Sequence, residues 1–148
     1  METTAGKAQL IMRIVRFGFI AFSALLIFLV FKLPAPSAAT PNPVAEVAIS
    51  IVALTNIALG FFAPRFLLSS ARMRSRHAST STPVQRWLSG CILSLALFES
   101  CVLFAFVLHQ IGARERIVET LFGLGMISLL FWNPGTPPSD EDRSASRE

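Results

Sequence analysis

Long hydrophobic stretches that carry almost no charge constrain this chain more than any other feature. Residues 17–31 and 47–64 contain no charged side chain, and between Arg86 and Arg114 the only residue charged at neutral pH is Glu99. A helix of about 20 apolar residues crosses the hydrocarbon core of a bilayer. Only 15% of the 148 residues are charged, whereas a soluble domain of this size needs a largely polar surface. The sequence therefore predicts an all-α integral membrane protein, folded as a four-helix bundle.

Prolines, glycines and charges divide the chain into nine segments. The helices end where proline-rich stretches such as 34–43 and 133–138 cannot continue them. The predicted order is an N-terminal cytoplasmic segment 1–9, transmembrane helix 10–33, a Pro-rich external loop 34–43, transmembrane helix 44–68, a basic cytoplasmic loop 69–85, transmembrane helix 86–110, a short external loop 111–116, transmembrane helix 117–132 and a disordered cytoplasmic tail 133–148.

The N-terminal segment has a second interpretation. A basic start, an apolar stretch and the small residues Ser37-Ala38-Ala39 are also typical of a cleavable signal peptide. The apolar stretch is long for a signal peptide and three further hydrophobic segments follow, so an uncleaved first helix is the simpler prediction. A mature protein beginning at Thr40 would support the signal peptide instead.

The distribution of lysine and arginine predicts the orientation, because cytoplasmic loops carry an excess of these residues. With both termini in the cytoplasm, ten of them lie inside and three, Lys32, Arg114 and Arg116, lie outside. Four of the inner residues are expected to orient the chain or to contact lipid headgroups: Arg72, Arg74, Arg76 and Arg86. We therefore expect the basic side chains, which give the chain a net charge of +4, to interact with the lipid bilayer as the chain's partner. We expect no nucleic acid partner, because no recognition motif accompanies the arginines.

Glu99 is the most informative polar residue of the chain. It lies twelve residues after Trp87, about 18 Å along a helix axis, and hence close to the middle of a hydrocarbon core of about 30 Å. An ionised carboxylate is unfavourable there unless it is paired or hydrated. Glu99 is expected either to bind and release a proton or to form an interhelical polar contact as a neutral acid. Asn56, central in the preceding helix, is the expected partner.

Small residues form a second feature of the third helix. Gly90, Ser94, Cys101 and Ala105 lie roughly opposite Glu99 at 100° per residue, and small side chains let helices approach closely. We expect these four to form a helix-packing stripe. If the stripe holds the bundle together, Glu99 would face lipid or a partner protein.

The segment Leu93–Leu108 resembles the carboxylate-bearing helix of the c subunit of rotary ATP synthases. In that family one helix enters the cytoplasm, a polar basic loop follows, and the next helix carries a proton-binding carboxylate in mid-membrane. The resemblance implies that Glu99 binds protons. It covers one helix closely and the preceding helix only loosely, because the c subunit has closely spaced glycines where the second helix here has only Gly60.

The whole pattern, with Arg86-Trp87 before the third helix and Asn133-Pro134 after the fourth, resembles small four-helix bacterial membrane proteins of unassigned function. This resemblance implies a multi-pass protein of the bacterial inner membrane and implies no activity. Trp87 and Trp132 are expected at the membrane interfaces.

Catalytic chemistry is not expected. The sequence has no phosphate-binding glycine loop, no nucleophile and base pair and no metal-ligand cluster, so we predict no enzyme activity, no cofactor and no metal. Cys91 and Cys101 are interpreted as small packing residues. The predicted function is that of an accessory or structural subunit that associates with other membrane protein subunits or with itself. The alternative is proton or ion translocation through Glu99, in an oligomer or with a partner subunit.

Overall fold

The computed structural model describes residues 4–33, 42–73 and 82–137 of the chain. These residues form helices and connecting turns, and they contain no β-strand, which confirms the all-α prediction. The helices are α1 (Thr4–Lys32), α2 (Pro43–Met73), α3 (Pro83–Gln110) and α4 (Glu115–Phe131).

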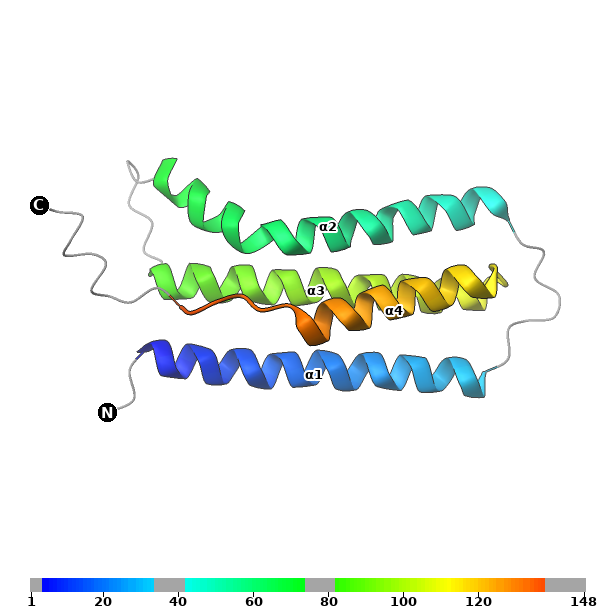
Figure 1. Cartoon of the computed structure of the whole chain (residues 1–148), viewed down its shortest axis with the longest axis horizontal. Helices are drawn as coiled ribbons and strands as arrows, with labels where there is room; N and C mark the ends of the chain where they lie inside the picture. The colour runs from blue at the N-terminus through cyan, green and yellow to red at the C-terminus, as the bar shows by residue number, and fades with distance from the viewer. Residues whose placement is uncertain (1–3, 34–41, 74–81, 138–148) are drawn as a thin grey trace, which may run out of the picture.

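Helix α3 is the centre of the fold (Figure 1). It packs against each of the other three helices, whereas α1 and α2 lie on opposite sides of it and do not contact each other in the described residues. Helix α4 packs mainly on α3 and also contacts α1 and α2. After α4 ends, the chain continues along the bundle as an extended segment, residues 132–137. Helix α3 therefore contacts every other helix, while Leu93, Leu103 and Val107 remain exposed on one of its faces.

Apolar side chains fill the interior in two clusters. The first consists of Ala8, Met12, Val84, Trp87, Cys91, Leu95, Phe98, Leu129 and Trp132. The second consists of Leu26, Ala53, Cys101, Val102, Ala105, Leu108, Val118, Leu121 and Phe122. Along α3 the first cluster ends at Phe98 and the second begins at Cys101. Only residues 99 and 100 separate them.

Local capping explains where α2 and α3 begin. Oδ1 of Asn42 accepts hydrogen bonds from the backbone N–H groups of Val44 and Ala45, at 3.1 and 3.3 Å. Before α3, Thr82 and Gln85 exchange hydrogen bonds between side chain and backbone, which satisfies two backbone donors at the helix start. Both helices have proline as their first residue, a position where the missing N–H is harmless.

The helices extend beyond the hydrophobic segments used to delimit them in the sequence. Residues 69–73 continue α2 and residues 83–85 begin α3, so the basic loop is shorter than the predicted 69–85. From Arg65 to Thr82 the sequence contains neither glycine nor proline, and polar residues can therefore continue the helix. Helix α1 likewise starts at Thr4 and α4 at Glu115.

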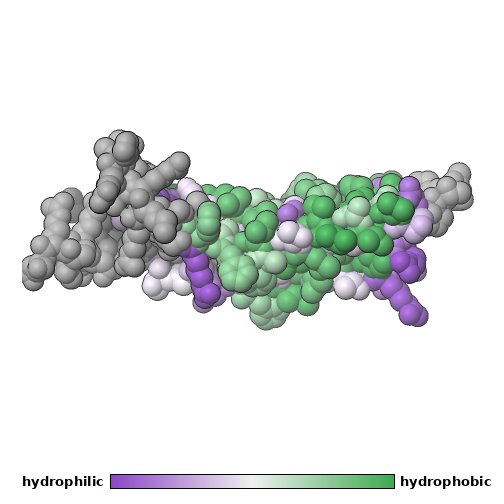
Figure 2. All heavy atoms as spheres, turned by 90° about the horizontal axis from the view of Figure 1, so that it is seen from above, coloured by the Kyte–Doolittle hydropathy of each residue, from purple (hydrophilic) through white to green (hydrophobic). Residues whose placement is uncertain are grey.

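Three helices, α1, α2 and α3, are each long and apolar enough to cross a membrane. Helix α4 has only 17 residues, about 26 Å at 1.5 Å per residue, and is not one of them. Figure 2 shows apolar side chains over the middle of the molecule and polar ones near both ends of the described part. The outward faces of α1 and α2 are strongly apolar, with side chains such as Phe17, Phe31 and Phe66 largely exposed.

Candidate functional site

Glu99 lies in the interior, between α3 and α1. The hydroxyl group of Ser23, in α1, donates a hydrogen bond to Oε2 of Glu99, and both side chains are buried. The second carboxyl oxygen, Oε1, is also buried and has no hydrogen-bond partner among the described residues. The expectation that Glu99 faces lipid or a partner protein is therefore wrong, because α1 covers this side of α3.

Asn56 forms a separate contact between α2 and α3. Its Nδ2 group donates a hydrogen bond to Oγ of Ser100 at 2.7 Å, and the Ser100 hydroxyl lies 2.7 Å from the carbonyl oxygen of Leu97. The predicted pairing of Asn56 with Glu99 is therefore wrong. Consecutive residues of a helix point about 100° apart, so Glu99 faces α1 while Ser100 faces α2.

These four residues, Ser23, Asn56, Glu99 and Ser100, are named the polar layer below. Each lies between the two apolar clusters: Ser23 comes before Leu26 of the second cluster, and Asn56 follows Ala53 of the same cluster. The layer links α3 to α1 by one hydrogen bond and to α2 by another. Because buried polar groups far from water find partners in neighbouring helices, the layer fixes the relative height of these three helices.

The small residues of α3 are buried as the sequence suggested. Gly90, Ser94, Cys101 and Ala105 are all in the interior. The Cys101 thiol donates to the carbonyl oxygen of Leu121, in α4, at 3.4 Å, and the Ser94 hydroxyl donates to the carbonyl oxygen of Gly90 at 3.0 Å. On the side of Glu99, Leu95 is buried as well, whereas Leu103 remains exposed.

Two glycines on the neighbouring helices permit close contact with α3. A Cβ atom on Gly125, in α4, would lie 2.6 Å from Cγ2 of Val102 and 3.3 Å from the carbonyl oxygen of Phe98. A Cβ atom on Gly60, in α2, would lie 2.6 Å from the ring of Phe98. That ring also contacts Phe61 and Trp132. Phe98 therefore packs closely between α2 and the end of α4.

Arg16 of α1 binds the end of α4, a contact that the sequence interpretation missed. Its Nε group donates a hydrogen bond to the carbonyl oxygen of Leu129 at 2.9 Å, and a terminal guanidinium nitrogen donates to that of Leu130. The last carbonyl groups of a helix have no partner within it, and the helix dipole places partial negative charge there. Arg16 supplies both the missing donors and a positive charge.

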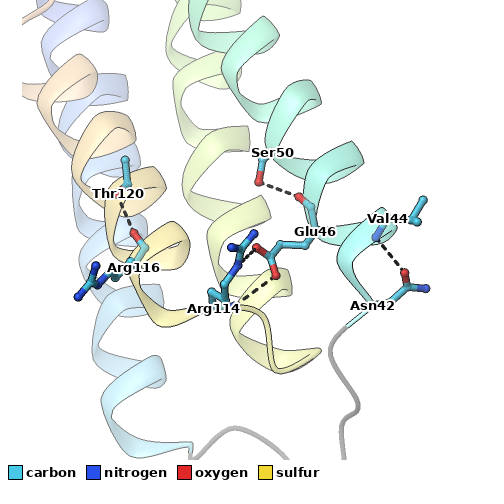
Figure 3. A network of polar contacts seen from close by, with 7 residues as sticks. All are labelled: Asn42, Val44, Glu46, Ser50, Arg114, Arg116 and Thr120. Atoms are coloured by element: carbon cyan, nitrogen blue, oxygen red, sulfur yellow. Dashed lines mark hydrogen bonds and ion pairs between the residues drawn. The ribbon is translucent and has the colours of Figure 1, made fainter.

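A second polar site lies at the opposite end of the bundle (Figure 3). Nε of Arg114, just before α4, lies 2.7 Å from Oε1 of Glu46, near the start of α2. The Glu46 side chain is 3% exposed and that of Arg114 is 69% exposed. Close to this end, Nε2 of His109 lies 3.1 Å from the carbonyl oxygen of Leu33. These contacts join the helix ends that the sequence predicts to be external.

The remaining predicted residues are placed as follows. Arg74 and Arg76 lie outside the described residues, as do Ser37-Ala38-Ala39 and residues 138–148. Arg72 belongs to the last turn of α2, and Arg86 lies in the first turn of α3 and is partly buried. Trp132 is buried against Phe98, not at a surface, because α4 stops before it reaches the end of the bundle.

Within residues 4–33, 42–73 and 82–137, no group of three or more His, Cys, Asp or Glu side chains could hold a metal ion. Comparison of the chain with protein-family models, with curated proteins and with solved structures gave no match.

Proposed function

We propose that this chain is a multi-pass protein of the bacterial inner membrane that acts as an accessory or structural subunit of a membrane assembly. Helices α1, α2 and α3 cross the bilayer, and α4 packs on α3 as the fourth member of the bundle. Both termini lie in the cytoplasm. The large apolar surface of three long helices supports this placement.

The hydrogen bond from Ser23 to Glu99 is the observation that carries this proposal. The one acid of the central helix lies inside the chain's own bundle and links two helices. The outer faces of α1 and α2 then present mostly apolar side chains at this depth, such as Leu25 and Leu54, which are about half exposed; the exposed Thr55 hydroxyl donates to the carbonyl oxygen of Ile51 in its own helix. These faces are suited to lipid, to another membrane subunit or to a second copy of the chain.

Gentle solubilisation followed by mass measurement tests this role. The chain is expressed at its natural level, crosslinked within the membrane and extracted into nanodiscs without harsh detergent. We expect a complex of defined mass that contains other membrane proteins or further copies of the chain. The variant Glu99→Gln should retain this complex, because the amide oxygen of the substituted side chain can still accept the Ser23 hydrogen bond. A strictly monomeric chain without partners would contradict the proposal.

Reporter fusions test the orientation. A reporter active only in the cytoplasm and one active only outside are fused in turn after Glu148 and within the loop between α3 and α4. We expect cytoplasmic activity at the C-terminus and external activity at the loop. The reverse pattern, or activity on the same side for both positions, would contradict the proposed topology.

Proton or ion translocation through Glu99 is the second candidate, and the free Oε1 atom favours it, since this buried oxygen has no partner among the described residues. Carbodiimide modifies protonated carboxyl groups in apolar surroundings. Translocation predicts labelling that disappears in Glu99→Gln, together with a proton flux in reconstituted vesicles that the same variant abolishes. Vesicles that show no flux above that of Glu99→Gln would exclude this candidate.

A further inference from the structure

An open groove lies beside the second half of α2, at the end of the bundle where α1 and α3 begin. It has a volume of about 450 Å³. One wall comes from α2 and the other from the last residue of α4 and the extended segment that follows. The lining residues are Phe61, Pro64, Arg65, Phe131, Trp132, Asn133, Pro134 and Gly135.

Two features of the backbone create this groove. Pro64 lies within α2, where it removes one helical hydrogen bond and bends the helix; Figure 1 shows that the following part of α2 turns away from α3. On the other side α4 ends at Phe131, and residues 132–135 continue without helical structure. A full-length α4 packed against a straight α2 would leave less room here.

The groove combines an aromatic lining with donors for an anion. The side chains of Phe61 and Phe131 are 48% and 79% exposed. The Arg65 guanidinium is exposed and forms no hydrogen bond or ion pair with the part of the chain that the structure describes. Oδ1 of Asn133 accepts a hydrogen bond from the backbone N–H of Gly135 at 3.1 Å, which leaves the Asn133 amide N–H groups as donors.

The depth of Arg65 suits a lipid headgroup. Arg65 follows Asn56 of the polar layer by nine residues, about 13.5 Å along the helix axis. Half of the hydrocarbon core is about 15 Å thick. With the polar layer at mid-depth, the Arg65 guanidinium reaches the phosphate level, while Phe61, one turn closer to the centre, remains within the hydrocarbon.

We propose that this groove binds an anionic phospholipid. The phosphate pairs with the guanidinium of Arg65 and with the amide of Asn133, and one acyl chain lies against Phe61 and Phe131. A single cation above an aromatic surface recognises a charged headgroup that carries an apolar tail, whereas a free anion would gain nothing from the aromatic side chains. This inference rests on the proposed insertion in the membrane and is independent of the accessory role.

Quenching of Trp132 fluorescence by brominated lipids tests the proposal. In Trp87→Phe, Trp132 is the only tryptophan of the full chain, and it lines the groove. The variant is titrated in mixed micelles with brominated phosphatidylglycerol or brominated phosphatidylcholine. We expect half-maximal quenching at an about fivefold lower mole fraction of the anionic lipid, the effect of one cation near a lipid phosphate. Equal quenching by the two lipids would overturn the proposal.

Four variants and one competitor show which residues cause the lipid preference. In the Trp87→Phe background, Arg65→Gln should abolish the preference, whereas Arg116→Gln, the same change at the other end of the bundle, should preserve it. If Arg65→Gln does not fold, Arg65→Lys should retain a reduced preference. Trp132→Phe, which retains only Trp87 outside the groove, should show no preference. A preference that survives in Arg65→Gln, or one that millimolar inorganic phosphate removes, would overturn the assignment to a phospholipid.

Discussion

The hydroxyl group of Ser23 in α1 donates a hydrogen bond to the carboxyl group of Glu99 in α3, and both side chains are buried where the two apolar clusters meet. A carboxyl group in this position is neutral in our account, because an ionised one would need a cation or water. The hydrogen bond links α1 to α3. The buried Glu99 side chain therefore needs no partner protein to satisfy this carboxyl oxygen.

Gly125 should not tolerate a side chain, whereas Gly123 should. We expect Gly125→Ala to lower the free energy of unfolding by about 1–3 kcal/mol, because its Cβ would meet Val102 and the backbone of Phe98. A Cβ on Gly123 would meet nothing within 4 Å, so Gly123→Ala should not destabilise the protein. Unfolding in mixed micelles, followed by circular dichroism, measures both. Equal effects of the two substitutions would contradict the packing of α4 on α3.

Loss of Arg16 should loosen the end of α4. Arg16→Gln removes the positive charge and part of the hydrogen bonding at the Leu129 and Leu130 carbonyl groups, worth about 1 kcal/mol at a helix C-terminus. Hydrogen exchange of residues 126–137, measured by mass spectrometry in nanodiscs, should be faster by about fivefold. Arg13→Gln, an exposed position on the same helix, is the control and should leave this exchange unchanged. Faster exchange in both variants would point to a general effect of charge.

The ion pair between Glu46 and Arg114 should contribute little and should depend on salt. A double-mutant cycle with Glu46→Gln and Arg114→Gln should give a coupling of about 0.5 kcal/mol, because the Arg114 side chain is 69% exposed. In 1 M salt, where the screening length is about 3 Å, the coupling should fall towards zero. Coupling that is unaffected by salt would mean that the pair is shielded from water, which would contradict the exposure of the Arg114 side chain.

The number and order of the helices could be predicted from the sequence because stretches without charge are long and sharply bounded by proline. Helix ends could not, since polar residues such as Ser69 and Ser70 continue α2 without any apolar signal. The length of α4 explains a further difference between the predicted and the observed structure, the position of Trp132. It stops at Phe131, and Trp132 is therefore buried against Phe98 instead of lying at a membrane interface.

The residues of the polar layer were easier to predict than the hydrogen bonds between them. Glu99 and Asn56 stand out because they are polar within apolar segments, but depth alone does not distinguish Ser23 from Asn56 as the partner of Glu99. Ser23 is itself the only polar side chain in residues 17–31, a signal that could have identified it. Which helix faces Glu99 depends on how α1 and α2 pack around α3, and a single sequence contains no record of that arrangement.

The role of Arg16 could not have been found from the sequence. A basic residue beside a hydrophobic stretch is typical of the membrane interface, and nothing local distinguishes an arginine that contacts headgroups from one that binds a helix end. The contact of Arg16 joins residues more than a hundred positions apart. It exists because α4 ends early and exposes its last carbonyl groups beside α1.

A double-mutant cycle between Ser23 and Glu99 tests the central claim most directly. Unfolding free energies are measured in mixed micelles for Ser23→Ala, Glu99→Leu and the double variant, with Glu99→Gln as the control that retains an acceptor oxygen. Our account predicts a coupling of about 0.5–1.7 kcal/mol, the range of interhelical hydrogen bonds in membrane proteins, and near wild-type stability for Glu99→Gln. Additive effects of the two single substitutions would show that Glu99 does not bind Ser23 and would contradict the account.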